Sequence, residues 1–322
     1  MTDTTFKIKE LHDSKLVYHY TSQEGMLSIL KNKTLWFTDV QFLSDKSELV
    51  TVIDAVIKAI EKLKNDTLNE TQLKLLSEIE SYVEYVEKSG DLFEFYSNKL
   101  CEDGQIRDTK GRYYVLCASK ASDDLGLWNY YVKNEKYCGY NIGINVEKVK
   151  ATWDQEIIIT GKEVLYDKTE QIDHFYNCIG RYLKDYYSGT TENNIEFGSM
   201  EIIGKLGVEI DDKKLFYKAE AFRDEREYRF IIEVDNLIEK DITYKDNIFG
   251  DGLTKEYRSG ESGVLTPYLV WNWGKQAPDL IEQITLSPMV EVDLAQESIS
   301  QLFDEYGLPG INIVPSSISK RF

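Results

Sequence analysis

LVYHYTSQEGMLSILKNKTLWFTD, residues 16–39, places one helical segment between two apolar segments with strand character. At its centre, Thr21 is suited to cap a helix, and Glu24, three residues later, to close a capping box. Asn32 lies where a left-handed residue would end that helix, and residues 34–38 have the composition of a strand. The stretch therefore predicts a β-α-β opening.

A long helical pattern begins at Ser47. Apolar residues recur at helical spacing in two runs, Leu49, Val52, Ile53, Val56, Ile57, Ile60 and Leu63, then Leu75, Leu76, Ile79, Val83 and Val86. Residues 47–103 are therefore expected to be an inserted helical hairpin. Its expected role is packing, because a single apolar stripe normally faces the protein's own core. A partner-binding surface is the alternative interpretation.

The remaining chain mixes strand and helix patterns. Strands are predicted at 112–119, 138–146, 215–232, 264–270, 281–286 and 311–314, and helices at 124–132, 171–187 and 294–306. No repeat, low-complexity tract or proline-rich linker divides the sequence. Residues 1–322 are therefore expected to form a single α+β domain that carries the helical insertion.

Composition limits the classes of partner. The 322 residues include 38 Lys and Arg against 56 Asp and Glu, a formal charge of −18, which disfavours non-specific binding to DNA. No signal-peptide pattern is present, and no apolar run approaches the roughly 18 residues of a membrane span, so a cytoplasmic protein without membrane contact is expected. The four cysteines lie far apart among only three histidines, and no metal site is expected.

Two segments carry candidate site residues. His19, Tyr20 and Thr21 directly precede a helix N-terminus, where side chains and backbone amides can meet a polar ligand. A structural histidine, hydrogen-bonded to nearby backbone, is the alternative for His19. These three residues are therefore candidates for ligand binding.

The second segment, Phe222 to Ile232, runs from charged residues into an apolar strand. Strand alternation would place Glu225, Glu227 and Arg229 on one face, so that two carboxylates and a guanidinium converge at the start of the strand. The alternative is an edge strand whose charges prevent aggregation.

Several motifs can be compared with known families. They are Leu16-Val17-Tyr18-His19-Tyr20-Thr21-Ser22, Thr34-Leu35-Trp36-Phe37-Thr38-Asp39, Phe42-Leu43-Ser44-Asp45, Leu127-Trp128-Asn129-Tyr130-Tyr131, Glu225-Arg226-Glu227-Tyr228-Arg229 and Val314-Pro315-Ser316-Ser317. Together they resemble the bacterial family catalogued as domain of unknown function 2971. The resemblance covers most of the chain outside the insertion.

The order of these elements is also similar, more distantly, to the His-Tyr-Glu branch of the ADP-ribosyltransferase superfamily. His19 matches the histidine, Trp36 stands where that branch has tyrosine, and Glu227 matches the glutamate. The resemblance implies a split, mixed or antiparallel β-sheet and NAD as substrate. It also implies that Glu225 orients or activates the acceptor and that Arg229 or Arg223 contacts the diphosphate.

The chemistry suits these residue types. Cleavage between nicotinamide and ribose develops positive charge on the ribose, which a buried carboxylate such as Glu227 stabilises. A cation–π interaction of nicotinamide with the indole of Trp36 would contribute about 0.5–2 kcal/mol to the binding free energy. His19 would orient a ribose.

The expected function is thus an NAD-dependent ADP-ribosyltransferase, an intracellular bacterial toxin or anti-phage defence effector. Its acceptor would be a macromolecule, protein or RNA, and an antitoxin or regulatory protein would be a further partner. An NAD glycohydrolase and a catalytically silent module of the same fold that binds a nucleotide or a protein remain alternatives.

Overall fold

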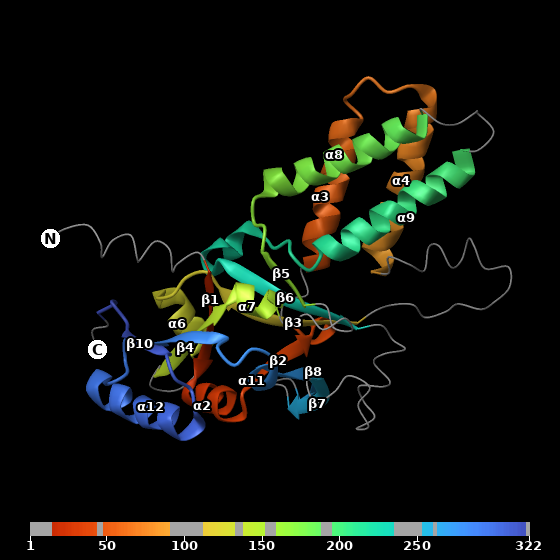
Figure 1. The fold of residues 1–322 in the computed structure, drawn as a ribbon. Coiled ribbons are helices and arrows are strands. Elements are labelled where there is room, and N and C mark those ends of the chain that lie inside the picture. Colours follow the sequence, from red (N-terminus) through yellow and green to blue (C-terminus); the bar gives the residue numbers. More distant parts are fainter. Residues whose placement is uncertain are drawn as a thin grey trace. The chain divides into compact units, whose positions relative to one another are not determined.

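The computed structural model describes the chain in eight stretches, residues 15–43, 48–90, 112–132, 138–151, 159–187, 195–234, 253–259 and 263–319 (Figure 1). The Ser44-Asp45 end of one motif and the end of the predicted insertion, residues 91–103, lie outside them. The chain divides into two compact units. We call them the sheet unit, residues 1–43, 109–163 and 224–322, and the helical unit, residues 44–108 and 164–223.

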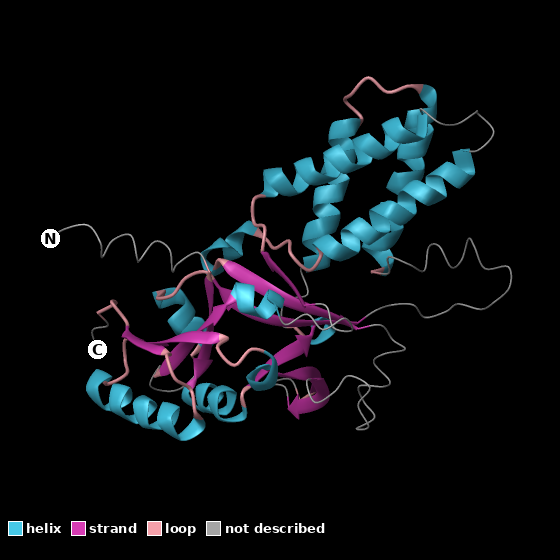
Figure 2. Cartoon of the chain, viewed as in Figure 1, coloured by secondary structure: helices cyan, strands magenta, loops and turns pink. Residues whose placement is uncertain are grey.

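The sheet unit contains an open, ten-stranded sheet among the described residues (Figure 2). Its main path has the order β10 (Asn312–Pro315), β9 (Ile281–Leu286), β4 (Gly139–Asn145), β1 (Leu16–Ser22), β3 (Arg112–Ser119), β2 (Thr34–Asp39), β8 (Leu265–Asn272) and β7 (Leu253–Ser259). From β3 a branch continues through β6 (Glu227–Val234) to β5 (Ile159–Glu163). The pair β9 and β10 is parallel, and the other pairings are antiparallel. The α+β class is confirmed.

Helices connect the strands of this unit. They are α2 (Gln23–Asn32), the 3₁₀ turn η1 (Val40–Phe42), α6 (Leu125–Tyr131), α7 (Val146–Ala151), α11 (Trp273–Gln276) and α12 (Val292–Tyr306). The β-α-β opening is confirmed, but both predicted caps of α2 are wrong by one position. Ser22 accepts the capping hydrogen bond from the amide of Gly25 at 3.1 Å, because β1 extends through Thr21, and the left-handed residue is Lys33, with φ 54°.

One face of the sheet forms the main core. Alternate residues of the central strands, including Leu116, Ile142 and Phe230, are buried together with α12 side chains such as Ile299. Trp271 and Trp273 are also buried in this core. Burial of side chains of this size stabilises a fold by roughly 1.5–3 kcal/mol each.

The helical unit packs four long helices around its own apolar core. They are α3 (Glu48–Leu63), α4 (Glu70–Ser89), α8 (Lys168–Tyr187) and α9 (Ile195–Lys213). The predicted hairpin appears as α3 and α4, whose stripes meet apolar residues of α8 and α9 such as Phe175 and Leu206. The single domain over the whole chain, with residues 47–103 as an insertion, stays a prediction. The structure shows that the hairpin also packs against α8 and α9.

The sequence pattern missed α9 and overestimated one strand. Glycines at 198, 204 and 207 interrupt the apolar spacing of α9, so its amphipathic pattern is weak. The predicted strand 215–232 begins only at Glu227, after the 3₁₀ turn η3 (Glu220–Glu225). Among the described helices, none combines the length and the apolar character that a membrane crossing requires.

Candidate functional site

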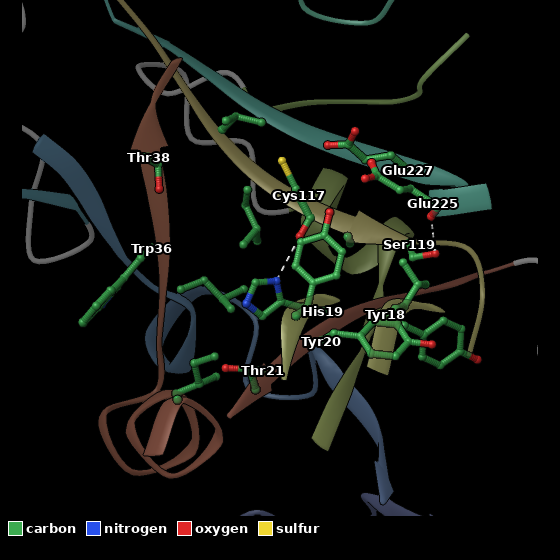
Figure 3. A pocket seen from close by; sticks show the side chains of 18 of the residues that line it. Tyr18, His19, Tyr20, Thr21, Trp36, Thr38, Cys117, Ser119, Glu225 and Glu227 are labelled. Atoms are coloured by element: carbon green, nitrogen blue, oxygen red, sulfur yellow. Dashed lines mark hydrogen bonds between the residues drawn. The ribbon is translucent and has the colours of Figure 1, made fainter. Parts of the chain in front are cut away.

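The sheet opens along one edge of β3. β1 pairs with β3 only through Tyr18 and Ser119, whereas β2 pairs with it at Tyr114 and Val115. Between these points, the described strands give Leu116, Cys117 and Ala118 no pairing with either β1 or β2. The two neighbours of β3 therefore separate, and side chains reach the gap between them (Figure 3).

A cavity of about 350 Å³ lies at this separation. That volume is at the lower end of the range of ligand sites, about 300–1,000 Å³. Its lining includes the predicted residues His19, Tyr20, Thr21, Trp36, Glu225 and Glu227. Side chains from β1, β2, η3 and β6 thus line one cavity, although His19 and Glu227 are more than two hundred positions apart in the chain.

His19 bridges the gap to β3. Its Nδ1 lies 2.9 Å from the carbonyl oxygen of Cys117. Since a carbonyl only accepts, Nδ1 must carry the proton. Burial, opposed in part by this hydrogen bond, lowers the pKa of His19. The ring is therefore neutral at pH 7, and its Nε2 is an acceptor for a ligand hydroxyl.

Glu227 is buried at the first position of β6 and paired with Arg229. The Nε of Arg229 donates to Oε1 of Glu227 at 2.8 Å, and Nη2 donates to Oε2 at 3.1 Å. Strand alternation predicted this shared face, and the ion pair confirms it. Arg229 itself does not line the cavity, so its predicted contact with a diphosphate stays a prediction that the geometry does not favour.

Glu225 reaches the cavity by a different route from the one expected. It belongs to η3 and not to the strand, so the alternation that was to place it beside Glu227 does not apply. The hydroxyl of Ser119 donates to the carbonyl of Glu225 at 2.7 Å, and Arg226, with φ 45°, turns the chain between the two glutamates. A non-glycine residue in this left-handed region costs of order 1–2 kcal/mol, and such strain is frequent at functional sites.

Tyr20 and Thr21 line the cavity from β1. The hydroxyl of Tyr20 donates to the carbonyl of Ala121 at 2.8 Å and accepts from the amide of Asp124 at 3.1 Å. Burial raises the pKa of Tyr20, and its ring packs edge-on against Trp128 at 4.6 Å. The hydroxyl of Tyr20 is thus held by the protein, whereas Thr21 is half-buried.

Trp36 lies at the rim and is 39% exposed. Its ring centroid is 4.6 Å from that of Tyr268 on β8, and the guanidinium carbon of Arg258 on β7 lies 5.9 Å from it. A second cation bound about 6–9 Å from that guanidinium would be repelled by about 0.5–3 kcal/mol at effective dielectric constants of 80–20. This repulsion is as large as the gain of about 0.5–2 kcal/mol from stacking a cation on indole.

Arg258 was missed because no element was predicted over residues 253–259, and Tyr268 because an aromatic residue within the predicted strand 264–270 is ordinary for a sheet core. Arg258 lines the cavity and is the one Arg or Lys to do so among the described residues. The mostly polar and mostly exposed sequence of β7 is ordinary for a strand at the edge of a sheet. The pairing of β7 with β8 brings Arg258 beside Trp36. This contact between Arg258 and Trp36 exists only in the tertiary structure.

Two motif ends meet away from the cavity. The carboxylate of Asp123 accepts from Trp128 Nε1 at 2.8 Å, from Ser316 Oγ at 2.8 Å and from the Ser317 amide at 2.7 Å. The Pro-Ser-Ser ending thereby holds the loop before α6. These residues have a structural role.

One group in the helical unit offers metal-ligating atoms. His174 and Cys178 on α8 and Glu209 on α9 place a nitrogen, a sulfur and an oxygen within 4.8 Å of one another. However, Lys213 Nζ lies 2.9 Å from Glu209 Oε1, and Arg181 Nη2 lies 3.8 Å from Cys178 Sγ. Lys213 already neutralises the Glu209 carboxylate, and the Arg181 guanidinium beside the sulfur would repel a metal cation.

Comparison with known proteins covers part of the chain. No curated protein and no solved structure matches it, so the likeness to ADP-ribosyltransferases has no support from relatives. Residues 127–230, which include Glu225, Glu227 and Arg229 but not His19 or Trp36, match the model of the family described as "Protein of unknown function (DUF2971)".

Proposed function

We propose that this protein cleaves the bond between nicotinamide and ribose in NAD and transfers ADP-ribose to a macromolecule. The observation that carries the proposal is the shared cavity of His19, Trp36, Glu225 and Glu227. These are the imidazole, aromatic and carboxylate groups that such a reaction uses, and they come from separate strands and a turn. A role as a bacterial toxin or anti-phage defence effector, with a regulatory partner, belongs to the same proposal.

Each group has a role in the reaction. Nε2 of the neutral His19 accepts a hydrogen bond from a ribose hydroxyl, while Nδ1 donates its own to the carbonyl oxygen of Cys117. Glu227 faces the positive charge that develops on the ribose as nicotinamide leaves, a contribution that grows in the transition state. Glu225 takes the proton of the incoming acceptor, which then bonds to the ribose carbon.

The acceptor distinguishes two enzymes with the same site. If water attacks the ribose, the products are nicotinamide and ADP-ribose, and the protein is an NAD glycohydrolase. If a side chain or a nucleotide attacks, the label of ADP-ribose remains on the macromolecule.

One observation favours a silent binding module as the second candidate. Both oxygens of Glu227 accept hydrogen bonds from Arg229, which lowers the negative charge that the carboxylate presents to a ligand. A module of this kind would bind the nucleotide without cleaving it.

The test is to incubate the purified protein with NAD labelled in the adenine ring and with cell lysate, following free nicotinamide and label on protein, RNA and DNA. Glu227→Gln should abolish nicotinamide release. Glu233→Gln, an exposed glutamate on the same strand, is the matched control and should retain it. Thermal unfolding of both variants shows whether each is folded.

Each outcome has a distinct meaning. Nicotinamide without macromolecular label identifies the glycohydrolase. An NAD-induced thermal shift without turnover identifies the binding module. Absence of both turnover and thermal shift overturns the proposal.

A further inference from the structure

Arg258 forms a cluster with two aromatic rings at the rim of the cavity. Its Nη2 donates to Thr38 Oγ1 at 2.8 Å, and its guanidinium carbon lies 5.4 Å from the ring centroid of Tyr268 and 5.9 Å from that of Trp36. The three supporting residues lie on adjacent strands, β2 and β8. The guanidinium is therefore held in a defined orientation beside an aromatic surface.

No carboxylate neutralises this guanidinium within the described part of the chain. Ion pairs at 4.0 Å or less join other arginines there, Arg112 to Asp39, Arg223 to Asp167 and Arg229 to Glu227, but not Arg258. Glu256, two residues earlier on β7, forms no such pair with it. Arg258 is an exposed residue, and partial desolvation of its guanidinium lowers its pKa.

The cavity is consequently divided by charge. Glu225 and Glu227 line it from η3 and β6, and Arg258 lines it from β7. The positive charge of Arg258 also contributes to the lowered pKa of His19, so its field extends across the cavity to β1. An anionic group of a ligand is attracted to the Arg258 cluster and repelled by Glu225, and only weakly by Glu227, whose charge Arg229 compensates. A cationic group is attracted to the Glu225 side and repelled by Arg258.

We propose that Arg258, Trp36 and Tyr268 form the subsite for the phosphate-bearing half of a nucleotide, in which the guanidinium binds a phosphate oxygen and the exposed indole stacks on a neutral base. This inference rests on the proposed function, and it reassigns Trp36. A neutral adenine stacks on an indole next to Arg258 without the repulsion that a cationic nicotinamide meets there. The nicotinamide riboside half then lies toward Glu225 and Glu227.

The test compares ligands that carry only one half of the dinucleotide. Calorimetric titration of the full chain with ADP-ribose, with inorganic pyrophosphate and with nicotinamide is repeated for Arg258→Gln, Tyr268→Leu and Trp36→Leu. The matched control is Lys255→Gln, which removes a cation of the same strand that does not line the cavity. Thermal unfolding confirms that each variant is folded.

Arg258→Gln should weaken ADP-ribose binding at least tenfold and reduce its salt dependence, while nicotinamide binding changes less than twofold. Trp36→Leu and Tyr268→Leu should weaken ADP-ribose more than pyrophosphate, because only ADP-ribose carries a base. Lys255→Gln should bind all three ligands as the wild type does.

The failure of this inference is distinguishable from that of the proposed function. If the wild type does not release nicotinamide but binds ADP-ribose through Arg258, the proposed reaction fails and the subsite stands. If NAD is cleaved and Arg258→Gln leaves KM within twofold of the wild type, the subsite is wrong and the reaction stands. Absence of ADP-ribose and pyrophosphate binding at millimolar concentration, or equal losses in Arg258→Gln and Lys255→Gln, also overturns the inference.

Discussion

The imidazole of His19 donates a hydrogen bond from Nδ1 to the carbonyl oxygen of Cys117, 2.9 Å away, at the point where β1 and β2 separate along β3. This single bond fixes the tautomer, orients the ring and leaves Nε2 as an acceptor. The structural alternative for His19 is confirmed at Nδ1, and ligand binding at Nε2 stays a prediction. One nitrogen is structurally bonded, and the same residue lines the cavity.

The first prediction concerns the pH dependence of stability. The pKa of His19 in the folded state is lowered below its ordinary value of 6.5, so the unfolded state binds more protons when the pH falls below 6.5. Stability should therefore decrease on acidification through this window, by at most about 1.4 kcal/mol per pH unit from this group. His19→Asn, which keeps a donor near the Nδ1 position but does not titrate, should show a smaller loss. Urea unfolding at pH 7.0, 6.0 and 5.0 measures the difference, and equal losses in both proteins would contradict the prediction.

The second prediction concerns the buried pair of Glu227 and Arg229. Removing one partner leaves the other charge buried without compensation, so Arg229→Ala should lower the free energy of unfolding by about 3–5 kcal/mol. In the double variant Glu227→Gln, Arg229→Ala, the loss should be smaller than the sum of the single losses by about 0.5–3 kcal/mol. Guanidinium denaturation of the four proteins gives this coupling energy. Additive losses would show that the pair is not coupled.

The third prediction concerns Gly25 in the first turn of α2. A Cβ atom at this position would clash with Oγ1 of Thr21, which lines the cavity. Gly25→Ala should therefore destabilise the protein by about 1–3 kcal/mol, although alanine is the better helix former. Thr21→Ala combined with Gly25→Ala removes the clash and should recover most of this loss. Thermal unfolding measures both variants, and a double variant as unstable as Gly25→Ala alone would locate the strain elsewhere.

The fourth prediction concerns Asp123. Its carboxylate accepts hydrogen bonds from Trp128, Ser316 and Ser317, and hydrogen bonds to a charged group contribute about 1.5–3 kcal/mol each without being additive. Asp123→Ala should lower the free energy of unfolding by about 2–4 kcal/mol and increase amide exchange at residues 312–318. Asp304→Ala, an exposed acid on α12, should do neither. Hydrogen exchange with mass spectrometry provides the readout, and unchanged exchange would remove Asp123 from this role.

The sequence alone determined the local elements wherever the period of apolar residues was strong. The strand predicted at 112–119 has those bounds in the structure, and the stripes of α3 and α4 indicated both helices. The sequence did not predict elements whose apolar pattern was weak, and it merged adjacent elements whose apolar residues run on from one to the next. The glycines of α9 obscured its period, and the run 215–232 contains a buried loop and a 3₁₀ turn whose apolar residues are indistinguishable from a strand without their partners.

The sequence also indicated His19, Glu225 and Glu227 as candidates, because their segments stand at strand ends next to turns. Trp36 was a candidate only through the resemblance to the His-Tyr-Glu branch. Only the tertiary structure decided which groups share a cavity and how each is charged. The separation of β1 and β2 along β3 and the contact of Arg258 with Trp36 arise from pairings between strands distant in the chain. The burial that keeps His19 neutral and the strand position that pairs Arg229 with Glu227 likewise exist only once the sheet has formed, since residue spacing fixes a face of a strand but not what lies opposite it.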